Sequence, residues 1–462
     1  MRRIFIGLLV ASSLLGFSQD KLLTIQDAIR GFQLYPKGLY DVQWLPGGKW
    51  FSQLTISEAL QTIEVQEISV TKGRNIRVSL DDINASLSED AQLKRLPRAN
   101  WINDKEFQFI SNSQGYAYHI EKKSIRILPF KNKFNVDAPQ FFSDGTGYVA
   151  ETEKGLAFDH NGNSAEIKSD IDGIVIGKTV HRSEFGISGG LFPSPSHALL
   201  AYYEMDERMV TQYPLYKLAD TPATTNMIRY PTAGAKSHHV HVKIKDLRNV
   251  SDAITIKTTG DPEQYLTNVS WSADEKYVLI ALVNRAQNHM WLNKYDAKSG
   301  AFIKTLFEET NERYVEPEHA AIFLPNDPSK FIWWSERDGY NHLYLYDIEG
   351  KLIKQLTKGE WIVTEYVGMS SDAKKLYIVG TKDSPLERHL YAVNMKNGKM
   401  DNLTQTPGFH NITANSNCSL FIDDFSSTTV PKQIRLLDGS GNLKEVIYTA
   451  ENPLKDYKIG EM

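Results

Sequence analysis

The sequence has few of the features that mark disulfide-rich, membrane-spanning or nucleic-acid-binding proteins. Its single cysteine, Cys418, excludes an internal disulfide, and its formal net charge of −4 leaves no basic field to attract a nucleic acid. Beyond the N-terminus no apolar run reaches the length of about 20 residues that spans a bilayer. Helical periodicity is almost absent after Leu60. Stability must therefore come from a packed β-sheet core, in which we expect Cys418 to be a buried strand residue.

The N-terminus is organised like a secretory signal peptide. Met1-Arg2-Arg3 carries positive charge, residues 4–17 are apolar, and the polar Ser18 and Gln19 follow. The apolar run is too short to cross a membrane as a helix. We therefore predict that residues 1–19 are a signal peptide. The mature protein would be exported to the periplasm, the cell surface or the extracellular space, with no membrane span left after cleavage.

A recurring phrase divides the rest of the chain into eight units. It consists of an aromatic or apolar residue, a polar turn, an apolar strand, a second strand rich in tyrosine, and a closing glycine turn. Short strands repeating about every 50 residues are typical of propeller blades. We predict an all-β fold, an eight-bladed β-propeller over residues 41–462, with a lead-in at residues 20–40. The copies begin at Trp44, Trp101, Phe142, Phe192, Trp271, Phe323, Met369 and Ala414.

The fourth unit is longer than the others. Its excess, residues 206–237, contains proline and tyrosine and is predicted to form an extended excursion from the fourth blade rather than a domain. Long insertions in regular repeats often carry function or contact a partner. Trp44, Trp101 and Trp271 stand at matching positions of their units, which favours packing between blades over a carbohydrate-binding platform.

Residues 180–190 contain the spacing of a hydrolase nucleophile motif. Gly186-Ile187-Ser188-Gly189-Gly190 matches G-x-S-x-G, which presents a catalytic serine only where a buried strand turns into a helix. Polar residues precede the motif here, and Pro193 and Pro195 follow it, which forbids a helix. We therefore interpret Ser188 as a turn residue and predict no catalytic residue in this sequence.

Two histidine groups could suggest a metal site. In His238-His239-Val240-His241 only His239 and His241 would share a face of a strand, and two ligands do not close a zinc site. His181 and Glu184 could form a metal pair, but no third ligand is visible, so we predict no metal and no cofactor. Glu184 itself lies in a connection where a carboxylate could bind a cation such as a free amino terminus; an ordinary exposed glutamate is the alternative.

Four phrases of this sequence resemble the N-terminal propeller of the dipeptidyl peptidase IV family, serine peptidases of the prolyl oligopeptidase clan, in the form found in exported bacterial members. They lie, in the family's order, at residues 180–187, 203–214, 228–234 and 384–391, and the likeness extends over roughly residues 23–458. The resemblance implies a propeller of eight blades, which agrees with the independent count of repeats.

The resemblance also implies functional residues. Glu184 matches a glutamate that holds the free amino group of the peptide substrate. Dipeptidyl members present two adjacent glutamates, whereas Ser183 precedes Glu184 here, so both dipeptidyl and tripeptidyl selectivity stay open. The family's substrate-carbonyl arginine has no match between Phe109 and His119. Residues 206–237 correspond to the segment through which such enzymes often dimerise, which implies a homodimer.

Family members continue into an α/β-hydrolase domain that carries the catalytic triad, and no such sequence precedes Met462. We therefore expect a propeller that gates substrate access and recognises peptide N-termini for a missing or separately encoded hydrolase domain, and that is inactive alone. The alternative is a stand-alone, non-enzymatic exported propeller that binds a peptide, a glycan or an envelope protein.

Overall fold

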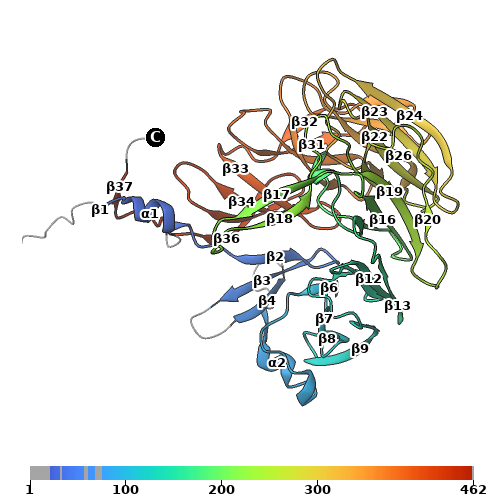
Figure 1. Cartoon of the computed structure of the whole chain (residues 1–462). Helices are drawn as coiled ribbons and strands as arrows, with labels where there is room; N and C mark the ends of the chain where they lie inside the picture. The colour runs from blue at the N-terminus through green and yellow to red at the C-terminus, as the bar shows by residue number, and fades with distance from the viewer. Residues whose placement is uncertain (1–20, 32–33, 57–60, 68–74, 460–462) are drawn as a thin grey trace, which may run out of the picture.

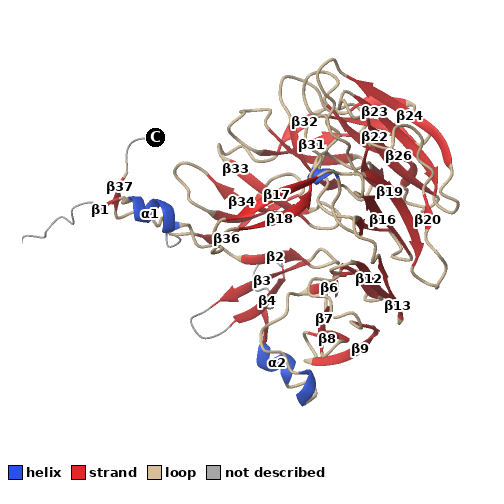
Figure 2. Ribbon diagram, in the orientation of Figure 1, coloured by secondary structure: helices blue, strands red, loops and turns tan. Residues whose placement is uncertain are grey.

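A ring of eight β-sheets accounts for most of the chain (Figure 1, Figure 2). The computed structural model describes residues 21–31, 34–56, 61–67 and 75–459, so the predicted signal peptide lies outside the described residues. Seven sheets have four strands, the sheet of the fourth blade has five, and all pairs within the blades are antiparallel. The predicted eight-bladed all-β propeller is confirmed.

Each blade takes its strands from one continuous stretch of the chain. Blades one to four contain β2 (Tyr40–Trp44), β3 (Trp50–Ile56), β4 (Gln61–Glu67) and β5 (Asn75–Ser79); β6 (Asn100–Asn103), β7 (Glu106–Ser111), β8 (Gln114–His119) and β9 (Ser124–Lys131); β10 (Gln140–Phe141), β11 (Gly147–Glu151), β12 (Gly155–His160) and β13 (Asn163–Lys168); and β14 (Ile174–Ile176), β15 (Leu191–Pro193), β16 (Leu199–Asp206), β19 (His239–Asp246) and β20 (Ile254–Thr255).

Blades five to eight are more regular. They contain β21 (Tyr265–Trp271), β22 (Tyr277–Val283), β23 (His289–Asp296) and β24 (Phe302–Thr310); β25 (Ile322–Leu324), β26 (Asp327–Ser335), β27 (His342–Asp347) and β28 (Leu352–Gln355); β29 (Val363–Met369), β30 (Lys375–Gly380), β31 (His389–Asn394) and β32 (Met400–Asn402); and β33 (Phe409–Ala414), β34 (Leu420–Ser426), β35 (Gln433–Asp438) and β36 (Leu443–Thr449). The short helices are α1 (Ile25–Arg30), α2 (Leu80–Asn84), and the 3₁₀ turns η2 (Glu89–Ala91) and η3 (His181–Ser183).

Burial is greatest in the second and third strands of the blades. The second strand of blade five, β22, is buried along almost its whole length, whereas β36, the last strand of blade eight, is mostly exposed. Neighbouring blades cover both faces of the middle strands, so these strands are apolar on both faces instead of alternating. The first strands of blades seven and eight, β29 and β33, contact each other.

The polar turn of the repeated phrase has a structural explanation. In three blades a serine hydroxyl at the end of the first strand accepts the backbone N–H five residues later, at 3.1 Å for Ser194, 3.0 Å for Ser272 and 3.0 Å for Ser370. Asn415 makes the same bond through its side-chain oxygen in blade eight, at 3.1 Å. The side chain therefore fixes the tight connection to the second strand, which is why small polar residues recur there.

The repeated tryptophans pack between blades, as predicted. The indole N–H of Trp44 donates to the Thr413 carbonyl at 2.9 Å, across the junction of blades one and eight. Trp101 donates to the Ser52 hydroxyl of blade one, also at 2.9 Å. Trp271 donates to the Phe192 carbonyl of blade four at 2.9 Å. Each tryptophan thus joins its own blade to the preceding one.

The ring closes through side chains. All four strands of blade eight come from the C-terminal part of the chain, so among the described residues no N-terminal strand completes that blade. Asn415 donates to the Gly48 carbonyl at 2.9 Å, and an apolar cluster that includes Phe51, Ile422 and Ile434 fills the junction. Closure therefore depends on packing and on a few hydrogen bonds.

A small element projects from the ring. The two-residue strands β1 (Lys21–Leu22) and β37 (Tyr457–Lys458) pair in parallel beside α1, and Figure 1 shows them away from the blades. Leu22, Ile25 and Ile29 on this element are 68%, 80% and 72% exposed. We call it the stalk. Within the described residues, no helix is both long and apolar enough to cross a membrane.

The insertion of the fourth blade is a β-hairpin. It leaves the blade after β16 and returns at β19, and its strands β17 (Gln212–Lys217) and β18 (Thr224–Arg229) pair only with each other. Most of its side chains are exposed. We refer to it as the hairpin.

Candidate functional site

The segment around Glu184 is a loop that interrupts the first strand of blade four. Both β14 and β15 pair with β16. The chain leaves this strand at Gly177, whose N–H donates to the Tyr203 carbonyl at 2.8 Å, and returns at Gly190, whose carbonyl accepts from the Tyr203 N–H at 3.1 Å. A Cβ atom on Gly190 would lie 2.3 Å from the Lys178 carbonyl oxygen, so the neck requires glycine. We call residues 178–189 the Glu184 loop.

The loop begins with a left-handed turn. His181, Arg182 and Ser183 have φ of 51°, 55° and 64°, and Phe185 has φ of 56°. Two backbone hydrogen bonds close the turn, from Ser183 N–H to the Val180 carbonyl at 3.0 Å and from Glu184 N–H to the His181 carbonyl at 3.1 Å. Left-handed geometry costs a non-glycine residue about 1–2 kcal/mol. Such a run persists only where surrounding contacts enforce it, and conformations of this kind concentrate at functional sites.

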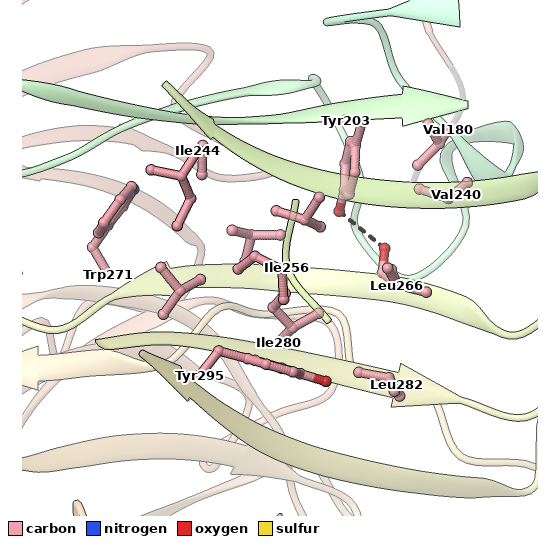
Figure 3. Packing of buried hydrophobic residues seen from close by; sticks show 14 of the residues in the cluster. Val180, Tyr203, Val240, Ile244, Ile256, Leu266, Trp271, Ile280, Leu282 and Tyr295 are labelled. Atoms are coloured by element: carbon pink, nitrogen blue, oxygen red, sulfur yellow. Dashed lines mark hydrogen bonds between the residues drawn. The ribbon is translucent and has the colours of Figure 1, made fainter. Parts of the chain in front are cut away.

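Blade five supplies many of these contacts. Val180 and Ile187 belong to the buried cluster between blades four and five, which also contains Val240 and Leu266 (Figure 3). The Phe185 ring packs edge-on against Tyr265, with ring centroids 5.0 Å apart.

Two backbone contacts complete these anchors. The Phe185 carbonyl accepts from the Thr267 hydroxyl at 3.1 Å. At Gly186 a Cβ atom would lie 2.0 Å from the Glu318 carbonyl oxygen, so the loop also lies directly against the connection to blade six.

Glu184 itself is exposed and held at one oxygen only. Its Oε2 accepts from the Gln287 side-chain amide at 2.7 Å, and the same amide nitrogen donates to the Tyr265 hydroxyl at 3.0 Å. Arg285 also donates to that hydroxyl. Within the described ranges, Oε1 of Glu184 makes no hydrogen bond. The result is an oriented carboxylate that contacts a neutral donor and retains a free acceptor oxygen, an arrangement suited to binding an ammonium group.

Two buried histidines lie behind the carboxylate. The Leu266 N–H donates to Nε2 of His181 at 3.0 Å, so the ring proton of His181 is on Nδ1 and is donated to Nε2 of His238, also at 3.0 Å. Burial lowers the pKa of His181 well below its usual value, and burial and the nearby Arg285 lower the pKa of His238 to about 4. Both rings are therefore neutral at neutral pH.

A cleft of about 630 Å³ lies beside the loop, between blades five and six. Its walls include Glu308, Glu316, Glu336, Tyr314 and Trp334. Burial and the charges of Glu316 and Glu318 raise the pKa of Glu336. The cleft adjoins the site because the Val315 N–H, at its edge, donates to the Gln287 carbonyl at 2.8 Å. Sequence analysis did not find it, since its walls come from separate turns of two blades.

Residues 156–432 match the family described as the dipeptidyl peptidase IV (DPP IV) N-terminal region. The chain belongs to this family. A Tuber melanosporum protein assigned as a dipeptidyl-aminopeptidase B is 23% identical over 438 residues, which cover 84% of this chain and 48% of that relative. An Aspergillus oryzae protein with the same assignment is 25% identical and is covered over 31% of its length. The chain thus spans about half the length, or less, of these curated relatives.

Solved structures support the DPP IV-type assignment. A protein of Bacteroides ovatus ATCC 8483 assigned as a dipeptidyl aminopeptidase IV superposes with a TM-score of 0.83 and 31% identity, over 95% of this chain and 64% of that one. The Porphyromonas gingivalis dipeptidyl peptidase 4 superposes with a TM-score of 0.75 and 20% identity, over 95% of this chain and 63% of that one. At that identity the second comparison shows the fold alone.

The structure places Ser188 far from the geometry of a nucleophile elbow. It is exposed in the Glu184 loop of this DPP IV-type propeller, and the extended strand β15, rather than a helix, follows it. Within the described residues its side chain makes no hydrogen bond to a histidine. Ser188 is predicted to be a turn residue, and it lies in the loop just after the turn at Phe185 and Gly186.

His181 and Glu184 are not arranged as a metal pair in this structure. Both ring nitrogens of His181 are engaged, one by a backbone N–H and the other by His238, so neither can coordinate a metal. His239 and His241 lie on β19 as the alternation predicts. Across the described ranges, no group of three or more His, Cys, Asp or Glu could hold a metal ion. What sequence reasoning missed is that His238, outside the strand, pairs with a residue 57 positions earlier.

Two further predicted features find their place. The segment between Phe109 and His119, where the family resemblance implies an arginine, is the tight connection between β7 and β8, with Asn112 and Ser113 as its turn residues. It has no loop that could carry a side chain into the ring. Cys418 is buried as predicted, at 3% exposure, and burial raises the pKa of its thiol to about 11. The prediction that it lies in a strand is wrong, because it has a φ of 53° in the turn between β33 and β34.

Proposed function

We propose that this chain is the substrate-recognition propeller of a dipeptidyl peptidase IV-type serine peptidase, and that Glu184 binds the free amino group of a peptide. The observation that carries the proposal is the oriented Glu184 carboxylate, which Gln287 holds at one oxygen and which has a free second oxygen. An ammonium group donates up to three hydrogen bonds and would add a charge-assisted bond at Oε1. The strained loop that carries Glu184 supports a functional role.

The propeller would also gate access to the catalytic centre. The Glu184 loop interrupts the first strand of blade four, between β14 and β15. The blades of a propeller surround a central channel, and we propose that the loop faces it. We propose that a peptide reaches Glu184 only as an extended end, because the carboxylate would pair with a free amino terminus. The cleft beside the loop would receive residues near the amino terminus, and its glutamates favour basic side chains over acidic ones.

Hydrolysis would require an α/β-hydrolase domain. The stalk supports such a partner because it exposes three large apolar side chains, Leu22, Ile25 and Ile29, on an element that lies apart from the ring. Exposed apolar residues that cluster in this way commonly mark an interface. We infer that the hydrolase domain contacts the stalk, whether it is encoded in the same gene or separately. Export directed by residues 1–19 belongs to the same proposal.

The hairpin would mediate a homodimer. Tyr213, Leu215, Tyr216, Leu218 and Met227 are exposed by 47%, 45%, 70%, 82% and 49%. Two copies related by a two-fold axis would bury these side chains against each other, since a symmetric interface uses the same patch on both subunits.

Binding of a free amino terminus tests the proposed role of Glu184. We would titrate the full chain with the tetrapeptide Ala-Pro-Ala-Ala and with its N-acetylated form by isothermal titration calorimetry. The free peptide should bind, and Glu184→Gln should weaken its binding about tenfold or more, the value of a charge-assisted hydrogen bond. Glu89→Gln, at an exposed glutamate in the turn η2 between blades one and two, serves as the matched control and should change nothing. Equal affinity for both peptides would refute the amine-binding role.

Hydrolysis assays separate the proposal from its alternative, a non-enzymatic propeller that binds a peptide, glycan or envelope protein. The purified chain should release no p-nitroaniline from X-Pro substrates. Recovery of activity on addition of an α/β-hydrolase domain would support the peptidase assignment, and peptide binding that is never followed by hydrolysis would support the alternative. Turnover that is abolished by Ser188→Ala would overturn our interpretation of Ser188.

A further inference from the structure

The hairpin contacts the Glu184 loop directly at two neighbouring residues. The Arg182 guanidinium carbon lies 4.2 Å from the centre of the Tyr230 ring, and Tyr230 directly follows β18. His181 donates to His238, which lies between the hairpin and β19. Figure 2 shows η3, the turn that contains His181 and Arg182, beside the strands of the hairpin. Both contacts come from the returning side of the hairpin.

The root of the hairpin is itself fixed to the start of blade four. Arg229 forms an ion pair with Asp172 at 2.5 Å and lies 3.8 Å from Glu207. The Tyr230 N–H donates to the Thr211 carbonyl at 3.1 Å, which ties the two sides of the hairpin together below the strands. The segment from Tyr230 to His238 is therefore attached at its start both to the hairpin and to blade four.

Glu184 lies between two sets of anchors. Blade five holds Phe185 on one side of Glu184 and also one ring nitrogen of His181 on the other, through the Leu266 N–H. The hairpin root holds the other ring nitrogen of His181 and the Arg182 side chain, through His238 and Tyr230. Those preceding residues have left-handed backbones that cannot persist without such contacts. If the contacts of the hairpin are lost, the turn can relax, and Glu184, one residue after the turn, will change its position relative to Gln287.

We propose that the hairpin positions Glu184 for ligand binding, with His238 and Tyr230 as the positioning residues. The inference rests on the proposed amine-binding role of Glu184. It implies reciprocal coupling: whatever orders the hairpin, such as a second copy of this chain, raises the affinity for a free amino terminus, and a bound peptide in turn stabilises the hairpin root.

Matched variants isolate these contacts. At position 238, His238→Gln keeps an acceptor near the Nε2 atom, whereas His238→Leu removes it and leaves the His181 N–H without a partner. At position 230, Tyr230→Phe keeps the ring that faces Arg182, and Tyr230→Leu removes it. Neither residue touches the ligand in the proposed site, so a change in affinity must act through the loop.

Hydrogen exchange and calorimetry provide independent readouts. In the full chain carrying His238→Leu and Tyr230→Leu, the amides of Ser183 and Glu184 should exchange about tenfold faster, and the affinity for Ala-Pro-Ala-Ala should fall about tenfold. The Gln and Phe variants should match the unmodified chain in both measurements. Exchange in β26 and β27 of blade six should stay unchanged, which shows that the propeller remains folded.

The outcomes separate the two proposals. Unchanged exchange at Ser183 and Glu184 in the double leucine variant would overturn the positioning role, even if Glu184→Gln still abolished binding. Faster exchange in a chain that never binds the free peptide would support the positioning role and refute the function proposed for Glu184. If the double variant fails to fold, Tyr230→Leu alone decides, because Tyr230 is 36% exposed and its replacement leaves the core intact.

Discussion

Replacing Gly190 with alanine should disrupt the neck of the Glu184 loop. The added Cβ atom would lie 2.3 Å from the Lys178 carbonyl oxygen and 2.6 Å from the Gly177 carbonyl carbon, whereas ordinary contacts begin at 3.4 Å. The neck would have to open by about 1 Å, against backbone atoms that pair with Tyr203 on both sides. Overpacking of this kind costs about 1–3 kcal/mol. We expect a lower apparent melting temperature and a weaker binding of the free tetrapeptide.

The adjacent glycine is the natural control. A Cβ atom on Gly189 would meet nothing within 4 Å, and its φ is outside the left-handed region. Gly189→Ala should therefore leave the melting temperature and the peptide affinity unchanged. Differential scanning fluorimetry and calorimetry on the two variants measure both effects. If Gly190→Ala and Gly189→Ala behaved alike, the close approach at the neck would not be what requires glycine, and our account of the loop would fail.

Three further predictions concern pH, blade packing and assembly. Burial, followed by the charges of Arg285, His239 and Arg182, lowers the pKa of His238 to about 4, and Glu263 opposes them. Between about pH 6.5 and pH 4 the unfolded chain therefore binds a proton at His238 that the folded chain does not. As the pH is lowered through this range, the free energy of unfolding should decrease by up to about 1.4 kcal/mol per pH unit. The decrease should be smaller in His238→Gln. Trp271→Phe should lower the free energy of unfolding, measured by thermal denaturation, by about 1–2 kcal/mol because it removes the hydrogen bond to the Phe192 carbonyl. The indole N–H of Trp291 donates no hydrogen bond within the described residues, so Trp291→Phe should lower the free energy of unfolding by less. Tyr216→Asp with Leu218→Asp should convert a dimer to a monomer in sedimentation equilibrium, and Lys217→Glu should not.

The regular part of the fold could be predicted because local sequence determines it. In four blades the serine or asparagine that follows the first strand bonds to a backbone N–H only five residues away, so the turn leaves a signal in a short window of sequence. Trp44, Trp101 and Trp271 recur for a related reason, since each occupies the same position of its blade and bonds to the preceding blade. Eight copies of one local pattern were therefore enough to give the number of blades.

The surroundings of Glu184 could not be predicted in the same way. His181 bonds to residues 57 and 85 positions later, and Glu184 to one 103 positions later, and none of these pairs has a local signal. The left-handed turn was also hidden, because His181, Arg182 and Ser183 are not residues that favour positive φ without tertiary contacts. The Glu184 carboxylate could be singled out from its position in the sequence and from the family resemblance, whereas Gln287 and the other groups that orient it could not.

The G-x-S-x-G spacing illustrates how a motif can arise from unrelated constraints. Gly186 is required because the loop lies against the Glu318 carbonyl with a φ of 71°, and Gly190 is required because the neck closes on Gly177 and Lys178. The two required glycines, Gly186 and Gly190, happen to lie four residues apart. Neither requirement depends on Ser188, the serine between these two glycines. In a hydrolase the same glycines make room for a nucleophile at the start of a helix. Here they let a strained loop pack against two other segments of backbone, and the residue that this packing exposes is Glu184.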